Sequence, residues 1–122
     1  MLRELRSHLT PESLQAVYAE GHPQGLRFTG AYMDGACLAV AGRRIVATTF
    51  CHRKLTIDDL VTGAAARSRG IGRAMLAELR GRARAADCHL LDLDSAVQRS
   101  EARRFYVRER MSIGAFHFIM EL

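Results

Sequence analysis

Lysine is nearly absent from this sequence, since Lys54 is the only one among 18 basic residues. The nucleotide-binding loop Gly-x-x-x-x-Gly-Lys-Ser/Thr is therefore excluded, because this lysine lies far from the glycine pair at 70 and 72. Long apolar runs are missing too, and none approaches the roughly 20 residues that span a bilayer. The segment from Met1 to Arg6 is charged and amphipathic, unlike the apolar core of a signal peptide. These absences predict a cytoplasmic protein with no membrane partner.

Cysteine is scarce, and its spacing is irregular. Cys37, Cys51 and Cys88 are odd in number and widely separated, which argues against a disulfide framework and against a paired-cysteine metal site. We expect buried free thiols that act as small apolar residues. The five histidines show no helical pair and no clustered ligand spacing, so the sequence predicts no metal cofactor.

The net charge of +5 raises the alternative of a nucleic-acid binder. However, the arginines fall into separate groups at 67–73, 80–84 and 99–110, and no aromatic residues interleave with the first two groups. A surface that stacks bases would need such aromatics, so we expect no nucleic-acid partner. With 122 residues and 48% hydrophobic composition, the chain has the size of one domain, residues 1–122.

Apolar periodicity and turn residues predict an α/β protein. Thr10-Pro11 is a typical helix start, Asp34-Gly35 a hairpin turn, and Gly42 a bend or bulge within a long strand. A tight turn is predicted at 52–54. The predicted order is helices over 2–9 and 11–20, strands over 26–33, 36–50 and 55–62, a helix from 71, a strand over 90–94, a helix around 102–106 and a last strand over 113–122.

The stretch from Arg67 to Ala74 carries the clearest chemical signal. It lies between a predicted strand and a predicted helix in which Ile71, Met75, Leu79 and Ala83 recur at helical spacing. Two glycines, at 70 and 72, let the backbone turn and approach a ligand, and the first helical N–H groups suit a phosphate. Arginines at 67, 69 and 73 add charge. A dinucleotide fingerprint is excluded, because Met75 stands where a third glycine is needed.

Two motifs together resemble those of the GNAT N-acetyltransferase superfamily. One is Arg-x-x-Gly-x-Gly after a strand, and the other is the A-x-x-F-Y segment Ala102-Arg103-Arg104-Phe105-Tyr106. The resemblance covers roughly residues 26–122. It implies a mixed, mostly antiparallel central sheet flanked by helices, and acetyl-CoA as co-substrate. It also implies direct transfer of the acetyl group to an amine of a small molecule or peptide.

The resemblance also implies which residues hold the coenzyme. Backbone groups of one strand would bond the pantetheine arm like an added strand, and the glycine turn would hold the pyrophosphate. The family often has asparagine at the position of Arg99. The usual contact of that asparagine is therefore not implied here, and a contact of Arg99 with a phosphate is the alternative. The implied coenzyme-binding residues are Leu60, Val61, Thr62, Arg67, Arg69, Gly70, Ile71, Gly72, Arg73 and Ala74.

Three residues are candidates for proton transfer. By resemblance Tyr106 donates a proton to the departing thiolate, which a phenol can do while neutral at pH 7. The alternative is a core aromatic. Asp58 and Asp59 are candidate bases, directly or through a water, and a structural role is the alternative. Strand alternation puts them on opposite faces and groups Asp58 with Leu60 and Thr62, unless a bulge intervenes. We favour Asp58 and place Asp59 second.

The predicted order departs from the family at its start. Family members usually begin with a strand before the first helix, whereas this sequence opens in that helix. The neighbouring strand edge would be unpaired, which favours association, for example as a homodimer, or lowers stability. The departure also keeps an alternative open, in which the same fold has lost catalysis and binds acyl-CoA as a sensor or partner module.

Overall fold

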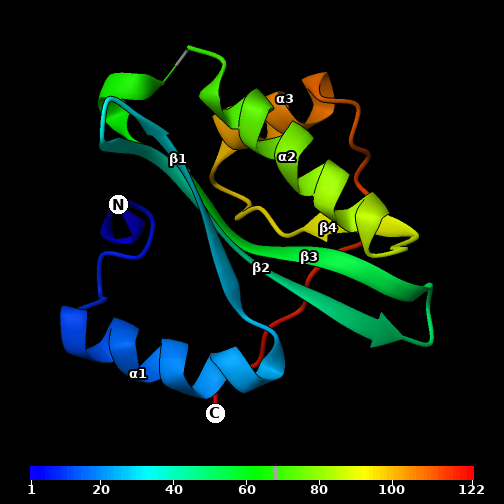
Figure 1. Cartoon of the computed structure of the whole chain (residues 1–122). Helices are drawn as coiled ribbons and strands as arrows, with labels where there is room; N and C mark the ends of the chain where they lie inside the picture. The colour runs from blue at the N-terminus through cyan, green and yellow to red at the C-terminus, as the bar shows by residue number, and fades with distance from the viewer. Residues whose placement is uncertain (68) are drawn as a thin grey trace.

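A computed structural model describes residues 1–67 and 69–122, so Ser68 of the glycine motif and the side chain of Ala65 lie outside the description. Four strands form one sheet in the order β1-β2-β3-β4 (Figure 1). The strands β1 (Arg27–Met33), β2 (Ala36–Thr48) and β3 (His52–Thr62) are antiparallel, whereas β4 (Leu90–Leu93) is parallel to β3. The predicted mixed, mostly antiparallel sheet is confirmed.

Helix α1 (Pro11–Gly21) begins where the sequence predicts, because the Thr10 side chain accepts a hydrogen bond from the Ser13 N–H in a capping box. The ring of Tyr18 lies 5.9 Å from that of Phe28 on β1. The predicted helix over 2–9 is wrong, since only a 3₁₀ turn at Leu2–Glu4 forms. That turn has no capping side chain and no buried residue, so it lacks the packing that stabilises short helices.

The two hairpins differ in how well the sequence locates them. Asp34 and Gly35 have φ of 52° and 80°, so the turn at 34–35 is confirmed. The turn predicted at 52–54 is wrong. Thr48 pairs with His52, which leaves a loop of residues 49–51. His52 has a φ of 72°, and a left-handed residue at the end of a three-residue hairpin loop meets the same need as glycine.

A bulge in β3 lies opposite Gly42. Gly42 pairs with Asp59 and the next residue, Arg43, pairs with Ile57, so Asp58 is an extra residue. The predicted irregularity at Gly42 is confirmed, but the extra residue is on the partner strand. The bulge puts Ile57 on the same face as Leu60, because their partners are two residues apart on β2. The grouping of Asp58 with Leu60 and Thr62 by simple alternation is therefore wrong.

Helices α2 (Ile71–Ala85) and α3 (Ser100–Arg108) cover the face of the sheet opposite α1 (Figure 1). Met75, Leu79 and Ala83 of α2 are buried in one cluster with Leu55 and other residues of β2 and β3. The apolar repeat of the sequence thus forms the packed side of α2. The predicted strand over 90–94 and the predicted helix around 102–106 are confirmed as β4 and α3.

The predicted last strand over 113–122 is wrong. Residues 112–122 are all exposed and pair with no strand of the described chain. An alternating sequence forms a strand only where a neighbouring ladder is available, and β4 is only four residues long.

The three cysteines are free and half-buried. None of the helices in the described ranges is long and apolar enough to cross a membrane.

Candidate active site

The candidate site lies where β3 and β4 part. Their pairing ends at Ile57 and Leu93, directly before the bulge at Asp58. From that point β3 continues alone on this side as far as Thr62, so its backbone edge has no neighbouring strand in the described chain. Two cavities lie along this opening, and they meet.

The larger cavity, which we call the glycine-turn cavity, has a volume of about 620 Å³. It contains the residues predicted to hold the coenzyme except Arg69 and Ala74. Its lining comes from β3, the glycine turn, α2 and α3: Leu60, Val61, Thr62, Ala66, Arg67, Gly70, Ile71, Gly72, Arg73, Arg99, Glu101, Ala102, Phe105, Tyr106, Arg108 and Glu109.

The glycine turn exposes backbone donors to this cavity. Gly70 precedes α2 with a φ of 75°, and no side chain caps the helix. The N–H of Ala74 donates to the Gly70 carbonyl at 3.0 Å, whereas the N–H groups before it have no partner within the helix. A Cβ on Gly72 would lie 3.2 Å from the Phe105 ring. The absence of a side chain at 72 therefore lets the turn approach α3 closely.

The three arginines of the motif do not act alike. Arg67 lines the cavity, and its Nε donates to the Thr62 carbonyl at 3.3 Å. Arg73 also lines it, and its Nε lies 3.5 Å from Oε1 of Glu109, the residue that follows α3. Arg69 turns away, with Nη2 3.6 Å from the sulfur of Met33 at the end of β1. Two of the three arginines therefore line this cavity.

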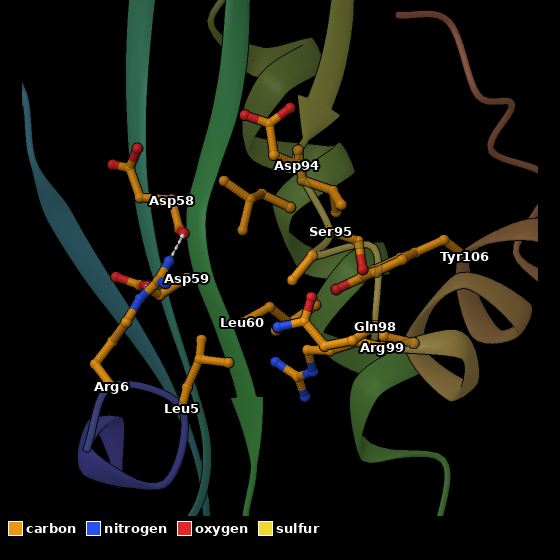
Figure 2. A pocket seen from close by; sticks show the side chains of 14 residues that line it. Leu5, Arg6, Asp58, Asp59, Leu60, Asp94, Ser95, Gln98, Arg99 and Tyr106 are labelled. Atoms are coloured by element: carbon orange, nitrogen blue, oxygen red, sulfur yellow. Dashed lines mark hydrogen bonds and ion pairs between the residues drawn. The ribbon is translucent and has the colours of Figure 1, made fainter. Parts of the chain in front are cut away.

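The smaller cavity, which we call the carboxylate cavity, has a volume of about 170 Å³. Figure 2 shows side chains entering it from the N-terminal turn, from β3 and from the segment that leads into α3. Its lining consists of Leu5, Arg6, Ile57, Asp58, Asp59, Leu60, Leu93, Asp94, Ser95, Ala96, Gln98, Arg99, Ala102 and Tyr106.

The two adjacent aspartates both line the carboxylate cavity, because the bulge interrupts the alternation that would separate them. Each carboxylate forms an ion pair: Asp58 with Nε of Arg44 and Asp59 with Nε of Arg6, both at 2.8 Å. Arg6 also donates to the Asp58 carbonyl at 3.3 Å. In Figure 2 both carboxylates point away from Tyr106. The pair thus fastens the N-terminal turn and β2 to β3.

Tyr106 lies at the junction of the two cavities. It lines both of them, together with Leu60, Arg99 and Ala102. Burial raises the pKa of the Tyr106 phenol above its ordinary value, and the nearby positive charge of Arg99 partly offsets that rise. The hydroxyl is therefore neutral at pH 7 and can donate a proton.

Sequence reasoning missed much of the carboxylate cavity. Leu5 and Arg6 enter it from a segment predicted to be helical, and no local pattern signals that Arg6 reaches Asp59. Ser95 and Gln98 belong to the segment between β4 and α3. Because they directly precede the helix with the A-x-x-F-Y motif, that motif is the one feature of the sequence that could have located them. Within the part of the chain that the structure describes, no group of His, Cys, Asp or Glu is arranged to hold a metal.

Three features together indicate the class of the protein. They are a mixed sheet in which β3 and β4 separate, a glycine turn that opens a helix, and a tyrosine that lines two cavities. The chain belongs to the acetyltransferase (GNAT) family, whose model matches residues 2–111. The resemblance seen in the glycine and A-x-x-F-Y motifs is thereby confirmed.

Individual relatives agree with this family. The chain is 33% identical over 107 residues to the uncharacterized N-acetyltransferase YhdJ of Bacillus subtilis (strain 168), covering 87% of this chain and 75% of the relative. A putative acetyltransferase from Agrobacterium tumefaciens str. C58 is 25% identical, with a TM-score of 0.82, covering 99% and 88% of the two chains. The ribosomal-protein-alanine N-acetyltransferase of Brucella melitensis is 16% identical, with a TM-score of 0.73 and coverage of 81% and 70%. The last likeness shows the fold alone.

Proposed function

We propose that this protein transfers the acetyl group of acetyl-CoA directly to an amine of a small molecule or a peptide. The observation that carries the proposal is the junction at Tyr106, where the glycine-turn cavity and the carboxylate cavity meet. A donor and an acceptor bound in the two cavities would have their reactive ends at the same side chain. Holding two reactants in this way is a large part of catalysis.

The glycine-turn cavity has the features that acetyl-CoA requires. Its volume of about 620 Å³ falls in the range of roughly 300–1,000 Å³ that ligand pockets occupy. Free N–H groups at the start of α2 and the guanidinium groups of Arg67 and Arg73 suit the pyrophosphate. The unpaired edge of β3 from Leu60 to Thr62 suits an extended amide-bearing arm. Arg69 and Ala74, which do not line this cavity, would contribute only through the conformation of the glycine turn.

The carboxylate cavity would receive the amine. In the reaction the amine nitrogen bonds to the acetyl carbon, the carbon–sulfur bond breaks, the thiolate gains a proton and the nitrogen loses one. Tyr106 would supply the proton to sulfur from its neutral hydroxyl. Asp58, or else Asp59, would take the proton from nitrogen through a water, since both carboxylates point away from Tyr106 (Figure 2).

The first test is binding. Acetyl-CoA that binds only the native state at 100 times its dissociation constant adds about 2.7 kcal/mol to the free energy of unfolding. For a chain of this size the melting temperature should rise by roughly 10 °C. ATP and NAD should raise it less. Equal shifts with all three compounds, or none with acetyl-CoA, would contradict the proposal.

The second test is turnover. Release of free thiol from acetyl-CoA, followed across a panel of small amines and peptides, separates an enzyme from a module that only binds. A protein that is stabilised by acetyl-CoA but releases no thiol with any acceptor would be the acyl-CoA-binding sensor or partner of the same fold.

A further inference from the structure

The two arginines that line the carboxylate cavity, Arg6 and Arg99, differ in their partners. The carboxylates of Asp58 and Asp59 are each paired with an arginine at 2.8 Å. The side chain of Arg99 also lines the cavity, yet it has no hydrogen bond or ion pair with any residue that the structure describes. In Figure 2 it reaches from the α3 side toward Leu60. The walls of the cavity are therefore unlike: carboxylates lie on the β3 side and a guanidinium available for a ligand lies on the α3 side.

The backbone that carries Arg99 is held in place. Its N–H donates to the Ala96 carbonyl at 2.9 Å, and its carbonyl accepts from the N–H of Arg103 at 3.2 Å. The Arg103 guanidinium in turn donates to the carbonyls of Ala96 and Val97. The segment before α3 is thus fastened to the first turn of that helix. A guanidinium on such a support is well placed for a defined ligand group.

The position of Arg99, directly before α3, favours a role at the acceptor end of the site. Glu109, which directly follows α3, contacts Arg73 beside the glycine turn, and the nine residues of α3 separate the backbone of Arg99 from that of Glu109 by about 15 Å. Arg99 instead shares both cavities with Tyr106 and acts on the pKa of its phenol. The glycine turn itself contacts α3 at Phe105, six residues after Arg99 and roughly 9 Å from it along the helix axis, so a pyrophosphate there would lie toward the other end of α3.

Resting on the proposed function, we propose that the acceptor amine carries a carboxylate and that Arg99 binds it, which makes Arg99 the residue that selects amino-acid-like acceptors. A guanidinium holds a carboxylate through two parallel hydrogen bonds, a geometry that fits its planar fork. The cavity of about 170 Å³ is compact. It suits the amino and carboxylate end of a small molecule, with the ammonium group toward the carboxylates of β3 and the carboxylate toward α3.

The test compares each of several L-amino acids with its carboxamide, which keeps the amine and loses the charge. The wild type should prefer the acid. Arg99→Gln should raise the KM of the acid about 10- to 100-fold, the worth of a hydrogen bond to a charged group, and leave the KM of the carboxamide and the Kd of acetyl-CoA unchanged. Arg99→Lys should restore part of the preference, because a point charge lacks the fork.

Arg104→Gln is the matched control, since Arg104 is an exposed arginine on α3 that lines neither cavity. It should change none of these constants. Equal turnover of acid and carboxamide by the wild type would overturn the inference while leaving the acetyltransferase proposal intact. A loss of acetyl-CoA affinity in Arg99→Gln, without a change in acceptor preference, would overturn it in favour of a phosphate contact. Absence of thiol release with every amine would instead count against the proposed function itself.

Discussion

The two cavities that meet at Tyr106 are built in opposite ways. In the glycine-turn cavity, the groups proposed to hold the coenzyme are largely backbone: an unpaired strand edge, a left-handed Gly70 and a helix start without a capping side chain. The carboxylate cavity is made by side chains from four separate segments, held by ion pairs such as Arg6 with Asp59. A backbone site recognises chemistry that many proteins share, whereas a site of distant side chains is particular to one chain. On the proposed function, the choice of acceptor would therefore depend on the carboxylate cavity.

The largest expected effect is a loss of acetyl-CoA affinity, and it tests the glycine-turn cavity. Gly72→Glu would place a carboxylate against the free N–H groups of the turn, where the pyrophosphate is proposed to bind. Its Cβ would also approach the Phe105 ring at 3.2 Å, so α3 must shift slightly. Affinity for acetyl-CoA, measured by calorimetry, should fall below detection.

Gly81→Glu adds the same charge to the same helix at a position with nothing within 4 Å, and it should bind acetyl-CoA normally. Gly72→Ala separates the two causes, because it keeps the Phe105 contact without the charge. Retained affinity in Gly72→Glu would mean that the phosphates bind elsewhere.

The next largest expected effect is a fall in kcat, and it tests the role of Tyr106 between the two cavities. Tyr106→Phe keeps the ring and removes the donor, so kcat should fall by about 10²–10⁴-fold, the usual worth of general acid catalysis. The Kd of acetyl-CoA should hardly change. Because burial raises the phenol pKa above 10.0, the hydroxyl keeps its proton at neutral and moderately alkaline pH and loses it only as pH rises through that raised value. Wild-type turnover should therefore decline only at a pH above the range in which an exposed tyrosine loses its proton, a decline that Tyr106→Phe lacks. An unchanged kcat would make Tyr106 a packing residue.

The contrast between local backbone features and side chains brought together from distant segments also explains what the sequence could predict. The glycine motif, the repeat of Met75, Leu79 and Ala83, and the turn at Asp34-Gly35 are local patterns, and the structure forms each of them. The order of most helices and strands along the chain followed from such patterns, whereas the mixed, mostly antiparallel sheet was implied by the resemblance to the GNAT family.

Several failures depended on long-range contacts. The position of the bulge was signalled by Gly42, yet which strand holds the extra residue depends on pairing between β2 and β3. Alternation alone put the two aspartates on opposite faces. The segment over 113–122 has the sequence of a strand but no partner among the described strands. The ion pair of Arg6 with Asp59 joins residues 53 positions apart, and no local periodicity reports such a contact.

The smallest effect decides between the two aspartates. If Asp58 accepts the amine proton through a water, Asp58→Asn should lower kcat toward the lower end of the 10²–10⁴-fold range and leave the Kd of acetyl-CoA unchanged. The substitution also breaks the ion pair with Arg44, so Arg44→Gln is the matched control: it breaks the same pair but keeps the carboxylate. Asp59→Asn should chiefly lower the free energy of unfolding, by at most about 1 kcal/mol, because its partner Arg6 is half-exposed. Urea melts and thiol-release rates of the three variants, taken together, assign the roles. A kcat that falls equally in Asp58→Asn and Arg44→Gln would show that the ion pair shapes the cavity and that Asp58 takes no proton.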